Sequence, residues 1–246
     1  MLGLSALDWS LLAVAALLVG FAKTAIGGVA SISIAIFAAV LPAKESTGAL
    51  LPLLLVGDLL AVRLYRRHAD WHRLVWLFPT VAVGVVIGAG FLAVVDDTVM
   101  RRTIGVILLG LVGVHLLVRL RGGMRTPIRA GGPAAAVYGL LAGFTTMVAN
   151  AGGAVMSLYL LSAGLGVLGF LGTGAWFFLV VNAFKVPFSV GLGLITPDSL
   201  LLCLALVPAL LVGGAIGKAC VDRIDQARFE QVVLVFTALA SLNLLR

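Results

Sequence analysis

The chain is a succession of long apolar runs separated by short polar or basic segments. The runs do not alternate as barrel strands of about ten residues do, so their length and flanking charges predict α-helices. A helix that crosses a bilayer needs roughly 20 apolar residues. The predicted elements lie at 6–22, 28–41, 46–64, 74–95 and 102–120, and at 133–149, 153–166, 170–190, 198–219 and 228–245. The pattern therefore predicts an all-α polytopic membrane protein.

The amino-acid composition indicates which binding partners to expect. Of the 246 residues, 62% are hydrophobic and 11% are charged, whereas a soluble domain carries about 25% charged residues. The net charge of +7 would suggest nucleic acid in a soluble protein. Here the basic residues lie in short loops between apolar runs, where they set membrane orientation. We therefore expect the lipid bilayer as a partner and no nucleic acid.

The two halves of the chain carry similar motifs in the same order. "GFAKTAIGG" at 20–28 matches "GFTTMVANAGG" at 143–153, and "TGALL" at 47–51 matches "TGAWF" at 173–177. Further residues match at one constant offset, namely Pro79, Gly84 and Gly88 with Pro208, Gly213 and Gly217. The order of these matches predicts an internal duplication.

Each half contains five predicted elements, so the second half enters the membrane from the opposite side, as in the inverted repeats of many transporters. The predicted organisation is a membrane repeat at 1–121, a basic cytoplasmic linker at 122–132 and an inverted repeat at 133–246. Of the 17 lysines and arginines, twelve fall in one set of loops and five in the other. Because basic loops favour the cytoplasm, both termini are predicted to be periplasmic, in a multi-pass protein of the cell inner membrane.

The first two elements of each half are short. Segments 28–41 and 153–166 each have 14 residues, about 21 Å as a helix, against a hydrocarbon core about 30 Å thick. Each short pair is therefore predicted to form a re-entrant or broken helix pair. Irregular backbone at membrane depth is tolerated where protein or a water-filled cavity covers it. We expect the two breaks to face each other near the midplane.

The breaks have the chemistry of an anion site. A helix that starts after a Gly-Gly pair presents free N–H groups and the positive end of its dipole, and glycine allows a ligand close to the backbone. The predicted substrate-binding residues are Lys23, Thr24, Gly27, Gly28, Ser31, Thr146, Asn150, Gly152, Gly153 and Ser157. In the alternative interpretation, the glycines only allow close helix packing and Lys23 extends to the cytoplasmic surface.

Three further polar residues interrupt apolar runs. A carboxylate in hydrocarbon needs a partner or a function, so Asp58 is a candidate for proton coupling or for the counter-charge of Lys23. The alternative is a structural ion pair with Arg63 near the cytoplasmic end. Asn182 is the predicted repeat counterpart of Asp58. Lys185 shares a helix face with Asn182 and either extends the anion path or lies at the outer interface.

Enzyme motifs are missing from the sequence, which has no Walker A motif, G-x-S-x-G, metal triad or paired catalytic carboxylates. The sequence therefore predicts a protein that is not an enzyme and binds no metal or cofactor.

The stretches "VGFAKTAIGG", "TGALLPLLLVGDLLAVRLYRRHADW" and "AGFTTMVANAGG" resemble the two repeats of the TauE/SafE sulfite exporter family, also called the toluene-sulfonate uptake permease group. This family often has three glycines in the first break, where the present chain has Gly27 and Gly28 followed by Val29. The resemblance implies a secondary transporter that exports small organosulfur anions, such as sulfite or sulfonates, across the inner membrane without ATP. With the inverted repeats, it predicts alternating access. The alternatives are a channel or uptake carrier for another small anion, or a non-transporting membrane subunit, and a homodimer is left open.

Overall fold

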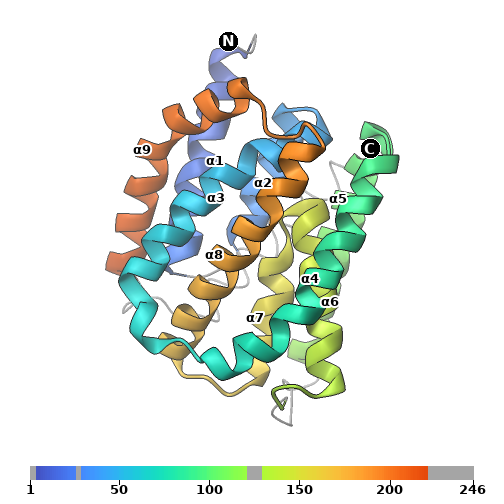
Figure 1. Cartoon of the computed structure of the whole chain (residues 1–246). Helices are drawn as coiled ribbons and strands as arrows, with labels where there is room; N and C mark the ends of the chain where they lie inside the picture. Colours follow the sequence, from blue (N-terminus) through green and yellow to red (C-terminus); the bar gives the residue numbers. More distant parts are fainter. Residues whose placement is uncertain (1–3, 26–28, 121–128, 221–246) are drawn as a thin grey trace.

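The computed structural model describes residues 4–25, 29–120 and 129–220, and over these residues the chain is helical and contains no strand (Figure 1). The helices in chain order are α1 (Ala6–Thr24), α2 (Ala30–Val40), α3 (Ala43–Tyr65), the short 3₁₀ helix η2 (Arg66–His68), α4 (Trp71–Val94), α5 (Asp97–Leu120), α6 (Pro133–Ala149), α7 (Gly152–Ser162), α8 (Val167–Gly191) and α9 (Pro197–Cys220). The all-α prediction is confirmed. The predicted tenth element at 228–245 and most of the linker at 122–132 lie outside the described residues.

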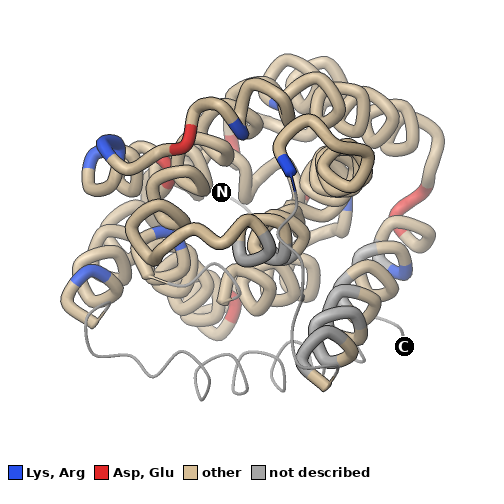
Figure 2. Tube along the Cα trace, turned by 90° about the horizontal axis from the view of Figure 1, so that it is seen from below, with Lys and Arg blue, Asp and Glu red and all other residues tan. Residues whose placement is uncertain are grey.

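Five of the described helices are long and apolar enough to cross a membrane. They are α1, α3 with its η2 extension, α4, α8 and α9. On α4, the side chains of Val75, Val83, Val86 and Ile87 are each more than half exposed. Most of the trace in Figure 2 is uncharged, and a broad exposed apolar surface suits contact with lipid. The chain is a multi-pass membrane protein.

The start of α1 is fixed by a reciprocal cap. The Ser5 hydroxyl accepts from the Asp8 N–H at 3.2 Å, while the Asp8 carboxylate accepts from the Ser5 N–H at 2.9 Å. This capping box satisfies two amides that would otherwise lack an intrahelical partner. The helix then runs through an apolar sequence to Thr24, which places Lys23 in its last turn.

The short helices α2 and α7 each contain 11 residues, about 16 Å in length, and are slightly shorter than the predicted elements. The break before α7 is formed by Asn150, whose backbone adopts the left-handed conformation with φ 52°. The N–H groups of Asn150 and Ala151 donate to the last carbonyls of α6 at 3.0 and 3.1 Å. This closing pattern ends α6 and lets α7 begin at Gly152. The corresponding break at 26–28 lies outside the described residues.

Helix α1 packs against α9, its neighbour on one side of the bundle (Figure 1). Glycines on both helices allow this close approach, because a Cβ at Gly20 would overlap the Leu210 carbonyl oxygen and one at Gly213 would overlap the Leu17 carbonyl oxygen. Backbone therefore lies directly against backbone at this crossing.

A second crossing of the same kind joins α4 to α6 on the other side of the bundle (Figure 1). A Cβ at Gly84 would overlap the Leu140 carbonyl oxygen, and one at Gly143 would overlap the Val81 carbonyl oxygen. The first helix of each half thus packs against the fourth helix of the other half. The third helices of the two halves, α3 and α8, also pack against each other.

Candidate functional site

A buried ion pair lies between α1 and α3. Asp58 of α3 is 0% exposed, and its Oδ1 atom lies 2.5 Å from Nζ of Lys23. The Lys23 ammonium also lies 4.4 Å from the ring centroid of Phe178 on α8. A cation is favoured in the last turn of a helix, where the dipole is negative. Three helices therefore hold this lysine in place.

A second buried lysine lies in the other half of the chain. Lys185 of α8 is 1% exposed, and its Nζ donates to Asn150 Oδ1 at 2.6 Å, Asn182 Oδ1 at 3.3 Å and Thr146 Oγ1 at 3.4 Å. An ammonium group has three N–H donors and no acceptor. Three oxygen acceptors around Nζ are thus the partners that a charged lysine needs when it is buried.

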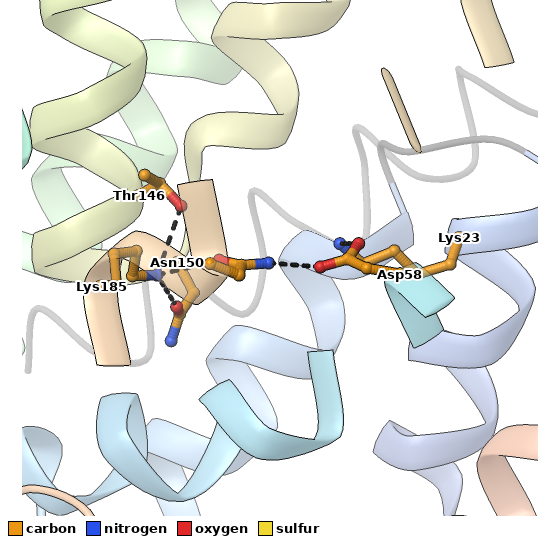
Figure 3. Close-up of polar contacts among 6 residues, drawn as sticks. Lys23, Asp58, Thr146, Asn150 and Lys185 are labelled. Atoms are coloured by element: carbon orange, nitrogen blue, oxygen red, sulfur yellow. Dashed lines mark hydrogen bonds and ion pairs between the residues drawn. The ribbon is translucent and has the colours of Figure 1, made fainter. Parts of the chain in front are cut away.

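Asn182 connects the two lysines. Its Nδ2 donates to Asp58 Oδ2 at 2.6 Å, while its Oδ1 accepts from Lys185. Figure 3 shows the resulting row of side chains, with Lys23 and Asp58 at one end and Lys185, Asn150 and Thr146 at the other. Together with Asn182, these residues form what we call the polar relay, namely Lys23, Asp58, Thr146, Asn150, Asn182 and Lys185. The relay crosses from the first half of the chain to the second.

The polar relay borders a cavity of about 60 Å³, which is large enough to hold more than one water molecule. One part of its wall is polar and contains Ser157 and Gly153 of α7 beside relay residues. The rest of the wall is apolar and comes from α1, α2, α3, α7 and α8. Its residues are Ala22, Ala30, Leu54, Ala61, Met156, Leu160, Phe170, Leu171, Gly174, Ala175 and Phe178. The cavity therefore has polar groups on one side and apolar side chains on the other.

The polar relay contains two lysines and one aspartate, so its ionised form has one net positive charge. Unpaired charge at membrane depth is costly, and where it occurs it marks an ion or substrate path. A small anion in the cavity would neutralise the excess charge.

The family comparison is consistent with this chemistry. The family model described as "Sulfite exporter TauE/SafE" matches residues 12–244. The chain belongs to the TauE/SafE sulfite exporter family. The resemblance predicted from the break motifs is thereby confirmed. Neither the curated proteins nor the solved structures contain a match to the chain.

Most of the predicted site residues meet at the cavity of this TauE/SafE protein. The residues that line it are Lys23, Asp58, Thr146, Asn150, Gly153, Ser157 and Asn182. Lys185 lies directly behind this wall and donates to Thr146, Asn150 and Asn182. Gly27 and Gly28 lie outside the described residues, so the predicted site at the start of α2 stays a prediction.

Three predicted residues lie elsewhere. The Thr24 hydroxyl donates to the Gly20 carbonyl at 3.1 Å and the Gly214 carbonyl at 2.9 Å, so it joins α1 to α9 instead of facing the cavity. Gly152 lies against Thr146, where an added Cβ would come within 2.8 Å of its Cβ, and it serves close packing of α6 and α7. Ser31 is half-buried in the first turn of α2 and is not among the cavity-lining residues.

The structure separates alternatives that the sequence left open. The Lys23 ammonium points to Asp58 and Phe178, not to the surface. Asp58 has Lys23 and Asn182 as its partners, whereas Arg63 is exposed one turn further along α3. Lys185 is buried among polar partners from α6 and α8.

Sequence reasoning did not identify Phe178. Its position four residues before Asn182 places both side chains on one face of α8, so the spacing contained the signal. Aromatic residues are common in apolar helices, and only the known position of Lys23 distinguishes this one. The contact contributes about 0.5–2 kcal/mol in comparable cation–π pairs.

Helix α3 is fastened to both halves near the cavity. Close to its start, the Thr47 carbonyl accepts from Asn150 Nδ2 at 3.0 Å. At its end, the Tyr65 hydroxyl donates to the Thr24 carbonyl at 2.7 Å. The helix that carries Asp58 is thus hydrogen-bonded to the ends of both α1 and α6.

Proposed function

We propose that this chain is a secondary transporter that exports small organosulfur anions, sulfite or sulfonates, across the cell inner membrane. The observation that carries the proposal is the polar relay, with two lysines and one aspartate from both halves of the chain, beside a small cavity. In a low-dielectric interior, an ammonium group attracts an anion much more strongly than it does in water. Membership of the TauE/SafE family supplies the class of substrate.

The proposed mechanism is alternating access by two inverted repeats. It is supported by the reciprocal crossings of α1 with α9 and of α4 with α6, each made by glycines in matching repeat positions. Transporters with inverted repeats bind substrate near the midplane, between the repeats, at the ends of broken helices. Here Asn150 ends α6 in such a break, and Gly153 of α7 lines the cavity. Movement of one repeat against the other would then expose the cavity to each side in turn.

We assign Asp58 the role of counter-charge for Lys23, since these two groups form the ion pair at the cavity wall. Proton coupling through the same carboxylate is the second role that its position allows, with Lys23, Asn182 and, through Asn182, Lys185 as its neighbours. A pH gradient across proteoliposomes distinguishes the two. If sulfite flux into vesicles responds to the gradient in the wild type but not in Asp58→Asn, Asp58 couples protons.

The test of the proposed function is anion counterflow in proteoliposomes that contain the full chain. We expect saturable exchange of sulfite or a small sulfonate, reduced at least tenfold in Lys23→Met and in Lys185→Met. Lys218→Met is the matched control, because this lysine is exposed at the end of α9, and its flux should equal that of the wild type. Thermal unfolding of each purified variant shows whether it folds.

Other outcomes would replace the proposal. Conductive, non-saturable anion flux would indicate a channel. Exchange that is specific for a different small anion would indicate another carrier. A wild type without flux would indicate a non-transporting membrane subunit. Folded lysine variants with unchanged flux would exclude the polar relay from the anion path.

A further inference from the structure

We propose that the cavity selects a monovalent anion over a divalent anion of similar size, and that Asp58 sets this selection. The inference rests on the proposed function and adds the charge of the substrate to it. The first step is the count of charges at the site. Among the described residues that line the cavity, Lys23 and Asp58 are charged, and Lys185 stands directly behind Thr146, Asn150 and Asn182.

The hydrogen bonds of Asn182 suit the ionised forms of Asp58 and Lys185. Its amide N–H faces Asp58 and its carbonyl oxygen faces Lys185. A carboxylate only accepts hydrogen bonds and an ammonium group only donates them, so a single amide orientation satisfies both. Lys23 contacts the other carboxylate oxygen. With all three groups ionised, the empty site has one net positive charge.

Because the site is buried, its net charge strongly affects which anion it binds. Asp58 and Lys185 are 0% and 1% exposed, so bulk water screens the site poorly. A monovalent anion brings the site to neutrality, whereas a divalent anion leaves one uncompensated negative charge. The cost of removing an ion from water also rises with the square of its charge, which further disfavours a divalent ligand unless two positive charges face it.

The carboxylate of Asp58 offsets one of the two positive charges at the site. With a neutral side chain at this position, Lys23 and Lys185 together would match a divalent anion. Asparagine has nearly the shape of aspartate and keeps an oxygen acceptor for the Asn182 amide. The Asp58→Asn variant therefore changes the charge of the site with little change in its volume.

The test measures equilibrium binding of methanesulfonate and sulfate to the purified full chain by isothermal titration at neutral pH, with sulfite as a third ligand. Both probes are tetrahedral at sulfur and keep charges of −1 and −2. We expect the wild type to bind methanesulfonate at least tenfold more tightly than sulfate. In Asp58→Asn, the ratio of the two affinities should move at least tenfold toward sulfate.

Two further variants separate charge from shape. Asp58→Glu keeps the charge and should keep the wild-type order. The double variant Lys23→Met, Asp58→Asn removes both members of the ion pair and leaves one net positive charge on Lys185, so the preference for methanesulfonate should return. It also leaves no uncompensated partner of the ion pair, which favours folding where the single variant fails. Asp198→Asn, at an exposed position of α9, should leave the ratio unchanged.

The outcomes distinguish this inference from the proposed function. A wild-type preference for sulfate, a ratio that Asp58→Asn leaves unchanged, or a double variant that keeps the shifted ratio of the single variant would overturn the charge selection alone. A wild type that binds none of methanesulfonate, sulfate and sulfite would overturn the proposed function, and the charge selection with it.

Discussion

Asn182 on α8 donates its amide N–H to the buried carboxylate of Asp58 on α3 at 2.6 Å, while its carbonyl oxygen accepts from Lys185. A single neutral side chain thus separates a carboxylate from an ammonium group and satisfies both. Because α3 and α8 belong to different halves of the chain, this side chain also joins the halves at the cavity. The consequences of this geometry can be measured.

Asn182→Leu should lower the free energy of unfolding by about 3–6 kcal/mol, since it removes two hydrogen bonds and those to charged groups contribute about 1.5–3 kcal/mol each. The substitution preserves most of the side-chain volume but removes the Asn182 partners of Asp58 and Lys185. Thermal or denaturant unfolding of the purified protein in detergent measures the loss. Ser10→Ala is the control, because its hydroxyl makes an exposed bond to the Ala6 carbonyl, and its stability should change by less than about 0.5 kcal/mol.

Gly20→Ala should destabilise the protein by about 1–3 kcal/mol, the usual range for an overpacked core. The new methyl group would meet the Leu210 carbonyl oxygen of α9, which is backbone and cannot move aside alone. Gly90→Ala of α4 is the matched control, because nothing lies within 4 Å of its added Cβ. An equal loss of unfolding free energy in both variants would show that the α1–α9 crossing does not depend on close backbone contact.

The effect of Asn150 can be divided between backbone and side chain. Asn150→Gly keeps the left-handed conformation available, whereas Asn150→Ala adds a penalty of about 1–2 kcal/mol. Both remove the contacts with Lys185 and the Thr47 carbonyl. We expect both variants to lose anion affinity by a similar factor in titrations, with Asn150→Ala clearly less stable in unfolding. Wild-type affinity in Asn150→Gly would exclude the side chain from the site.

Membrane orientation can be tested with single cysteines in a Cys203→Ala, Cys220→Ala background. Arg67→Cys in η2 belongs to the predicted cytoplasmic loops, and Glu45→Cys at the start of α3 belongs to the predicted periplasmic loops; both positions are exposed. An impermeant maleimide added to spheroplasts should label Glu45→Cys at once and Arg67→Cys only after lysis. The reverse pattern would place the termini in the cytoplasm.

The sequence predicted the helices and the family because both depend on strong, local signals. Apolar runs of sufficient length can hardly be anything but membrane helices, and the break motifs are distinctive in order. Charged residues such as Lys23 and Asp58 also stand out, because charge in an apolar run needs an explanation. Their partners were harder to assign, since the sequence does not specify how each helix is rotated about its axis.

That rotation explains the residues that sequence reasoning misplaced or missed. Thr24 follows Lys23 directly, yet successive residues on a helix point about 100° apart, so Thr24 faces Gly214 of α9 while Lys23 faces Asp58. Apolar residues of the cavity wall, such as Met156 and Phe170, carry no signal in an apolar sequence. Only the packing of α1, α3, α7 and α8 together shows which of them face the cavity.

The attachment of α3 at both of its ends has a mechanical consequence. Its hydrogen bonds from Asn150 to Thr47 and from Tyr65 to Thr24 lie about 27 Å apart along its axis. If α3 slides along its axis as one unit, both attachments move together. A displacement at the α1 end of this helix would thus reach the α6 end through a single element that also carries Asp58.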